Sequence, residues 1–195
     1  EYVGATMATK DSREDGFDVR ITQAATRSSV TGSTALTQDM VNAGEELVII
    51  EDGKIASYTS SADDTVETTV QNLRSEIKRN RLNVDIELDR SGVITINHKD
   101  YGSDASFQVS SSTAGVLGVE ADKISTSVQG LDVKGTINGE SAIGHGQILK
   151  GIKGAKCTEG LSVRYYADGR GLLMEPDCTI SDMEVEGEDG ETKIE

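Results

Sequence analysis

Apolar and polar residues alternate along much of the chain, and a period of two predicts half-buried strands. The first such segment has Phe17, Val19 and Ile21 on one face. The next two apolar runs, 47–50 and 54–58, flank an Asp-Gly pair, which is a strong signal for a hairpin turn. Further strand patterns lie at 84–88, 93–98, 106–110 and 161–165. The pattern therefore predicts a protein built mainly of antiparallel strands.

One segment changes to helical spacing. Its apolar positions are Val66, Val70, Leu73 and Ile77, which form one stripe along a helix at about 64–80. We expect Asp64 to cap the helix, with Glu67 completing a capping box. The basic residues Lys78, Arg79 and Arg81 follow in the last turn, where they complement the helix dipole. The helix therefore accounts for this basic cluster without a nucleic-acid site.

These elements predict an α+β, β-rich fold with two small antiparallel-sheet subdomains, one of which carries the packed helix. We expect the first subdomain at 31–118 and the second at 1–30 together with 119–195. The segment 26–44 is mostly small and polar, and it reads as a linker or a short helical turn outside the core. The acidic tail, 184–195, has too few apolar residues to bury, and we expect it to be disordered.

Composition narrows the classes of partner. The net charge of −15 opposes binding to nucleic acids and to anionic membrane surfaces. No apolar run approaches the roughly 20 residues that cross a bilayer. The first residues lack the pattern of a signal peptide, which leaves a cytosolic protein, an internal fragment, or export without a cleaved signal.

Candidate chemistry is sparse. The two histidines are His98, at the end of a strand, where we expect a partly buried and hydrogen-bonded imidazole, and His145, between two glycines, where we expect a solvated side chain. No nucleophile elbow, phosphate-binding loop, EF-hand or Cys-x-x-Cys pair is present in the sequence. We therefore expect no enzyme activity, no cofactor and no metal.

The segment 130–151 has the most specific residue order. It reads Gly-x-Asp-Val-x-Gly-Thr-Ile-Asn-Gly-Glu, then Ala, then Gly-x-Gly-Gln-x-Leu-x-Gly. By geometry alone it predicts a hairpin, in which the extended runs 131–137 and 147–149 are joined through Asn138-Gly139, a pair suited to positive φ.

This residue order closely resembles the IN motif of bacterial flagellar proteins. The motif positions are Gly135, Thr136, Ile137, Asn138, Gly139 and Gly146. The segment 15–25, Asp-Gly-Phe-x-Val-x-Ile-Thr-Gln-Ala-Ala, resembles the strand that enters the outer domains of flagellar cap proteins. The helix with its following strands, and the Gly-Leu-x-Val strand after the motif, occur in the same family order, so the resemblance extends over about 15–166.

The resemblance implies a structural piece of the flagellum, namely the outer domains of a filament cap protein that supports flagellin assembly at the filament tip. The parent chain would be secreted unfolded, lie outside the cell, associate with itself through long terminal helices, and contact flagellin, hook-associated proteins and a host surface or mucin. The piece itself would be monomeric or weakly associated. Two alternatives remain: the exposed variable region of a flagellin or hook-associated protein, and an unrelated adhesin or carbohydrate-binding module.

Two cysteines, Cys157 and Cys178, flank the turn signal at 168–171. In an extracellular protein such a pair tends to be oxidised, so we expect a disulfide between them. Two unrelated buried thiols are the alternative.

Overall fold

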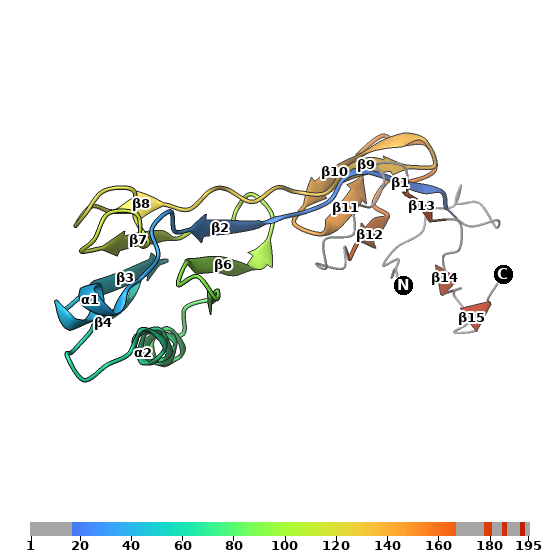
Figure 1. The fold of residues 1–195 in the computed structure, drawn as a ribbon. Helices are drawn as coiled ribbons and strands as arrows, with labels where there is room; N and C mark the ends of the chain where they lie inside the picture. The colour runs from blue at the N-terminus through green and yellow to red at the C-terminus, as the bar shows by residue number, and fades with distance from the viewer. Residues whose placement is uncertain (1–16, 167–177, 181–184, 187–191, 194–195) are drawn as a thin grey trace. The chain divides into compact units, whose positions relative to one another are not determined.

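The computed structural model describes residues 17–166 together with the backbone of 178–180, 185–186 and 192–193. The chain forms two compact units, one of residues 27–130 and one that combines 1–26 with 131–195. Both are built mainly of antiparallel strands, with helices in the first (Figure 1). The predicted α+β, β-rich class is confirmed.

The unit of residues 27–130 contains two antiparallel sheets, one in the order β4-β3-β7-β8 and one in the order β2-β6-β5. Their strands are β2 (Arg27–Thr31), β3 (Glu46–Glu51), β4 (Lys54–Thr59), β5 (Val84–Leu88), β6 (Ile94–Tyr101), β7 (Gln108–Ser111) and β8 (Ser125–Thr126). Just after β8, Val128 forms an antiparallel bridge with Ser29 of β2. The two sheets are therefore joined at this point. The subdomain expected at 31–118 lies wholly within this unit.

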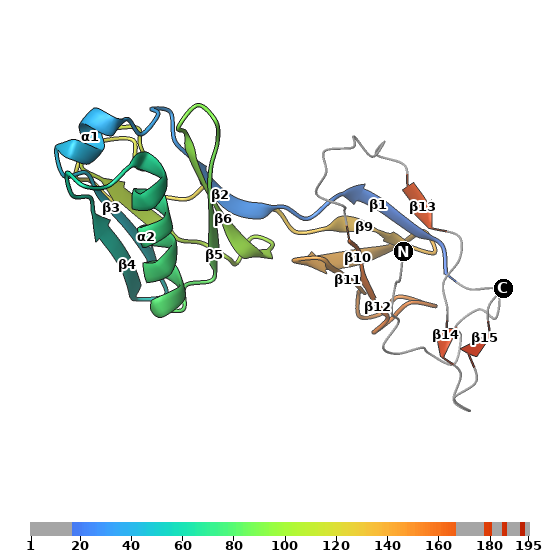
Figure 2. The same cartoon turned by 60° about the horizontal axis from the view of Figure 1, so that its bottom comes forward.

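Two helices complete this unit, α1 (Gln38–Asn42) and α2 (Val66–Arg79). The longer helix, α2, lies against β4 and β5 (Figure 2). Its residues Val70, Leu73 and Ile77 are buried, as the helical spacing predicts, and Val66 is partly buried against them. They share one apolar core with the inward side chains of both sheets. Burial of this stripe holds α2 in place.

The helix begins one residue later than its sequence suggests. Thr65 is the N-cap: its hydroxyl accepts a hydrogen bond from the Thr68 N–H (3.2 Å), and the Thr68 hydroxyl accepts one from the Thr65 N–H (2.7 Å). The expected capping box of Asp64 and Glu67 is wrong. The Asp64 carboxylate instead accepts hydrogen bonds from the Ser61 N–H and the Tyr58 hydroxyl, both at 2.8 Å. These bonds, led by the one from Ser61, lower the pKa of Asp64.

Of the linker or short helical turn expected at 26–44, the helical turn is present as α1, but the segment does not lie outside the core. Arg27–Thr31 pairs with β6, and both Leu36 and Val41 are buried in the core. The inward face of β2 carries Ser28, which is fully buried, in place of an aliphatic residue. Its sequence therefore lacks the apolar alternation by which strands are recognised.

The other unit is organised around a six-stranded antiparallel sheet in the order β12-β11-β10-β9-β1-β13. Its strands are β1 (Val19–Gln23), β9 (Lys134–Ile137), β10 (Glu140–His145), β11 (Ile148–Gly151), β12 (Ser162–Arg164) and β13 (Cys178–Ile180). The predicted apolar faces of the segments 17–21 and 161–165 are both buried. In the segment expected to be disordered, β14 (Val185–Glu186) pairs with β15 (Thr192–Lys193).

Candidate functional site

The motif segment forms a three-stranded part of this sheet. Asn138 and Gly139 have φ values of 50° and 73°, and they form the tight turn between β9 and β10. The predicted turn is confirmed, but the predicted hairpin partner is wrong, because β10 lies between β9 and β11. The only large aliphatic residue of β10 is Ile143, and its side chain is 65 % exposed. With no buried apolar face, β10 gives no hydrophobic pattern that sequence reasoning could detect.

Asn138 ties the motif turn to the start of β1. Its backbone N–H donates to the carbonyl oxygen of Asp18 (2.6 Å), and its side-chain oxygen accepts from the Asp18 N–H (2.7 Å). Asparagine suits this position because it tolerates positive φ and also provides the acceptor. The residue therefore fixes the position of β1 relative to the β9–β10 turn.

The other motif residues also serve the backbone. Ile137 is fully buried, and Thr136 lies opposite Arg20 in the β1–β9 ladder. A Cβ at Gly135 would collide with the carbonyl oxygen of Arg20. Gly146 has a φ of 55°, and its N–H donates to the Asp132 carboxylate at 2.7 Å. Each of these residues forms a turn, allows two backbone segments to approach closely, or buries its side chain, and none presents a reactive group.

Glu140, the residue after the Asn-Gly turn, has a role that the sequence did not reveal. Its carboxylate accepts hydrogen bonds from the Thr158 hydroxyl (2.6 Å), the Lys156 N–H (2.8 Å) and the Cys157 N–H (3.2 Å). The bond from Thr158 is the largest cause of a pKa below the usual value for glutamate. Glu140 therefore holds the 156–158 loop beside β10. Only its place next to the turn could have hinted at this role.

We expect Glu140→Gln to destabilise the protein at neutral pH, because the amide replaces one acceptor oxygen with a donor. The pKa of Glu140 is lowered by folding, so its carboxylate stabilises the folded state above the unfolded-state pKa. This contribution is lost as the pH falls through the lower, folded-state pKa. Urea unfolding at a series of pH values should show the variant and the wild type converging in acid. The control Glu159→Gln removes an equal charge from the same unit, and a gap that stays constant with pH would contradict the assignment.

The cysteines are placed unequally. Cys157 is half-buried, and its N–H contacts Glu140, whereas the backbone of Cys178 lies in β13 opposite Ile21. The side chain of Cys178 lies outside the described part of the chain. The Cys157–Cys178 disulfide therefore stays a prediction.

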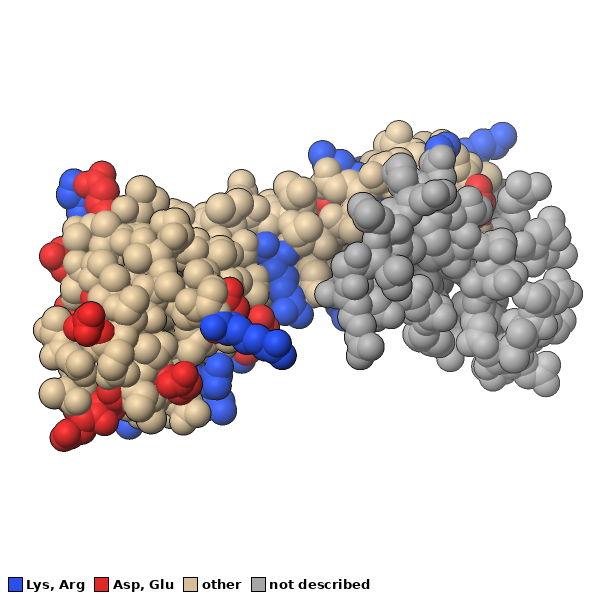
Figure 3. All heavy atoms as spheres, in the orientation of Figure 1, with Lys and Arg blue, Asp and Glu red and all other residues tan. Residues whose placement is uncertain are grey.

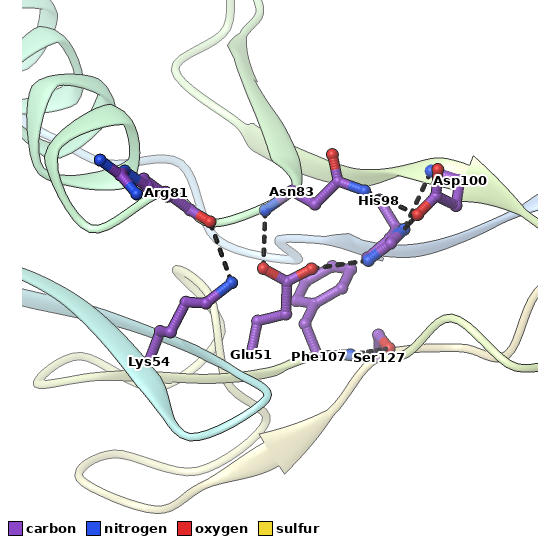
Figure 4. A network of polar contacts seen from close by, with 8 residues as sticks. All are labelled: Glu51, Lys54, Arg81, Asn83, His98, Asp100, Phe107 and Ser127. Atoms are coloured by element: carbon purple, nitrogen blue, oxygen red, sulfur yellow. Dashed lines mark hydrogen bonds and ion pairs between the residues drawn. The ribbon is translucent and has the colours of Figure 1, made fainter.

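The second candidate is a buried polar cluster in the unit of residues 27–130 (Figure 4). His98 is 5 % exposed, and its Nε2 atom lies 2.7 Å from Oε1 of Glu51, which is 3 % exposed. The Asp100 N–H donates to Nδ1 of His98 at 3.0 Å. Since Nδ1 accepts this hydrogen bond, Nε2 is the ring nitrogen that donates to Glu51. The expectation of a hydrogen-bonded imidazole is confirmed.

The carboxylate of Glu51 has a second donor. Its Oε2 atom accepts from the Asn83 N–H at 2.6 Å, so both oxygens have partners. Glu51 ends β3 and His98 lies on β6, so the cluster links the two sheets of the unit (Figure 4). Because both side chains are buried, no substrate can reach them. The cluster supports the fold, as a hydrogen-bonded buried polar group should.

The remaining candidates offer no further site. His145 is exposed at the end of β10. Glu45 is buried, but its carboxylate accepts from the N–H (2.9 Å) and hydroxyl (2.6 Å) of Thr113. Among the described residues, no group of three or more His, Cys, Asp or Glu side chains is arranged to hold a metal ion.

In the face shown in Figure 3, uncharged surface is extensive, and the acidic and basic side chains form small scattered groups in which the two signs lie side by side in places. Within the described ranges, no helix has the length and apolar character needed to span a bilayer.

Comparison with known proteins identifies the fold. No family model matches the sequence, and no curated protein matches it. Among solved structures, the D2-D3 domains of the flagellar cap protein FliD from Serratia marcescens match with a TM-score of 0.53 and 16 % identity, covering 86 % of this chain and 93 % of that one. The D2-D3 domains of FliD from Escherichia coli match with a TM-score of 0.52 and 17 % identity, covering 85 % and 88 %.

A second crystal form of the Serratia marcescens domains covers 92 % of this chain and 99 % of that one, with a TM-score of 0.50 and 13 % identity. The matches extend over nearly the whole of both D2-D3 fragments. The chain therefore has the fold of the D2-D3 domains of flagellar cap proteins, and the resemblance seen in the sequence is confirmed at the level of the fold.

Proposed function

We propose that this chain forms the outer domains of a filament cap protein of a bacterial flagellum. Its role is structural, at the tip of the filament and outside the cell, where the cap supports assembly of flagellin. The parent protein associates with itself and contacts flagellin or hook-associated proteins. The chain catalyses no reaction and uses no cofactor.

The observation that carries this proposal is the match of the whole two-unit fold to flagellar cap D2-D3 domains. The division of the chain into two units agrees with it, because each matched fragment also consists of two domains, D2 and D3. The chemistry of the described residues agrees with it. The motif residues Asn138 and Gly146 form hydrogen bonds within their own unit, and both oxygens of each buried carboxylate, Glu45 and Glu51, accept hydrogen bonds within the fold.

Immunogold electron microscopy of the source bacterium tests this proposal. Antibodies raised against the 195-residue chain should label the distal ends of flagellar filaments and leave their sides unlabelled. A strain from which the coding sequence has been deleted is the control, and we expect it to lose both the label and the full-length filaments.

The location of the label separates the alternatives. Label along the whole filament would instead indicate the variable region of a flagellin, and label at the base would indicate a protein of the hook. Label on the cell body alone, with filaments intact in the deletion strain, would indicate an adhesin or a carbohydrate-binding module. Each of these results would overturn the cap assignment.

A further inference from the structure

The turn between β9 and β10 contains the only Asn-Gly pair in the sequence, Asn138-Gly139. No motif residue acts on another molecule, but an Asn-Gly pair can react with itself. The backbone nitrogen of the glycine attacks Cγ of the asparagine, and glycine has no side chain to hinder this approach. Each of the other five asparagines precedes a residue with a side chain; they are Asn42, Asn72, Asn80, Asn83 and Asn97. The reaction is therefore favoured at the motif turn.

The reaction is a loss of ammonia followed by an uptake of water. The Gly139 nitrogen gives up its proton and bonds to Cγ of Asn138, the Cγ–Nδ2 bond breaks, and Nδ2 leaves with a proton as ammonia. Water then opens the five-membered ring. Opening at Cγ leaves an aspartate at position 138, and opening at the backbone carbonyl carbon leaves an isoaspartate, whose main chain runs through the side chain. Water is the only co-reactant.

The folded turn keeps the reacting atoms apart. The φ values of Asn138 and Gly139, 50° and 73°, are those of a type I′ turn, in which ψ of the first residue is about 30°. This ψ directs the Gly139 nitrogen to the side of the Cα–C bond opposite to Cβ of Asn138. Ring closure requires the nitrogen and Cβ to be eclipsed, so the peptide would have to rotate through most of a half turn. That rotation breaks the pairing of Ile137 with Glu140.

The surroundings of the turn oppose this rotation. The two hydrogen bonds between Asn138 and the backbone of Asp18, at 2.6 and 2.7 Å, hold both the backbone and the side chain of the asparagine. Ile137, the residue before the turn, is fully buried. The turn therefore cannot rearrange without opening the sheet around it.

We propose that Asn138-Gly139 is a self-modification site that folding of the motif-bearing unit suppresses. The native chain keeps its asparagine, and a chain that unfolds is deamidated at this position. The reaction rate at Asn138 is then set by how often the unit opens.

The modified turn fits the fold poorly. Nδ2 of Asn138 is buried, and it finds no hydrogen-bond partner among the described residues. Deamidation puts a carboxylate oxygen in its place, and an unpaired buried charge is costly. An isoaspartate also lengthens the main chain by one atom, which displaces the bonds to Asp18. Deamidation therefore marks a chain that has unfolded and hinders its return to the native state.

Peptide mapping of the full chain, incubated at mildly alkaline pH either folded in buffer or unfolded in urea, tests this proposal. Trypsin releases the motif turn as the peptide 135–150, in which mass spectrometry detects the change from amide to acid. Enzymatic methylation by an isoaspartyl methyltransferase measures the isoaspartate. We expect deamidation in urea to be at least about tenfold faster, because the folded chain reacts only through its rare open state. The other five asparagines are the internal reference and should stay amidated in both samples.

Two variants test the chemistry and its consequence. Gly139→Ala places a side chain beside the attacking nitrogen, so it should slow deamidation in urea by at least about tenfold, and this measurement does not require the variant to fold. Asn138→Asp makes one product directly and should lower the urea midpoint of the Leu149 amide signal. Gln147→Glu is the matched control, since it makes the same change at a half-buried residue of the next turn, and it should shift the midpoint much less.

Three results would each overturn the proposal: equal rates at Asn138 in the folded and unfolded chain, an unchanged rate in Gly139→Ala, or equal midpoints for Asn138→Asp and Gln147→Glu. Complete loss of the folded Leu149 signal in Asn138→Asp alone would be the extreme form of the expected effect. All these measurements concern the isolated chain, so their failure would leave the proposed role at the filament tip standing.

Discussion

Gly144→Ala will destabilise the unit that contains the motif by about 3 kcal/mol, at the upper end of the usual cost of overpacking. A Cβ built at Gly144 collides with the carbonyl oxygen of Val133, and the next atom that it meets is the carbonyl carbon of the same residue. Backbone atoms cannot move aside as a side chain can. Gly144 lies within β10 opposite Leu149, which is fully buried, so any shift of the strand disturbs the core.

Urea unfolding followed residue by residue with amide NMR signals will measure this effect, because the Leu149 signal reports on this unit alone. Gly154→Ala is the control. Gly154 has a φ of 86° and no atom within 4 Å of its added Cβ, so its substitution costs only about 1 kcal/mol of backbone strain. Equal destabilisation by the two variants would show that the contact with Val133 is not what requires glycine at position 144.

Glu51→Ala will destabilise the unit of residues 27–130 by about 3 kcal/mol, because it leaves two buried donors without an acceptor. These donors are Nε2–H of His98 and the backbone N–H of Asn83, both bonded to the carboxylate. The lost link also joins the two sheets. The urea midpoint of the Ile96 amide signal, which belongs to the strand that carries His98, will report the loss.

Glu51→Gln separates the lost hydrogen bonds from the lost side-chain volume. The amide keeps one acceptor oxygen, so one donor remains satisfied, and we expect about half of the destabilisation, roughly 1.5 kcal/mol. If Glu51→Gln is as stable as the wild type, the carboxylate is not needed as a double acceptor. If it is as unstable as Glu51→Ala, a single remaining bond contributes nothing.

Sequence reasoning found the elements whose signals are local. The Asp52-Gly53 turn, with φ values of 47° and 76°, and the stripe of α2 both follow from residues close together in the chain. It missed β2 and β10, for which burial and pairing, not apolar alternation, decide the conformation. Strands of small and polar residues depend on partners elsewhere in the fold, and a single sequence does not show those partners.

The residues of the candidate sites, like the strands, could be predicted only where their signal is local in the sequence. The motif glycines and Asn138 stand out because their positions require particular backbone geometry. Glu51 and His98 do not, because 47 positions separate them and only the sheet pairing brings them together. Glu45 and Thr113 are similarly distant, with a separation of 68. Polar residues that pair over such long separations show no regular spacing in the sequence, so these pairs could not be predicted.

The unit of residues 27–130 lies in the sequence between the two parts of the other unit, and we expect it to fold first. Strand β1 pairs with β9 only across the whole of the inserted unit, and closing so long a loop is entropically costly. The inserted unit is continuous in sequence, and its ends meet where Ser29 and Val128 exchange hydrogen bonds of 3.0 and 2.8 Å. Once it has folded, Thr26 and Leu131 are held close enough for their own bond of 2.8 Å. A closure over roughly a hundred residues becomes one over a few, which lowers its cost by roughly 3 kcal/mol. Folding of the unit of residues 27–130 therefore brings β1 and β9 close together and favours formation of the sheet that carries the motif.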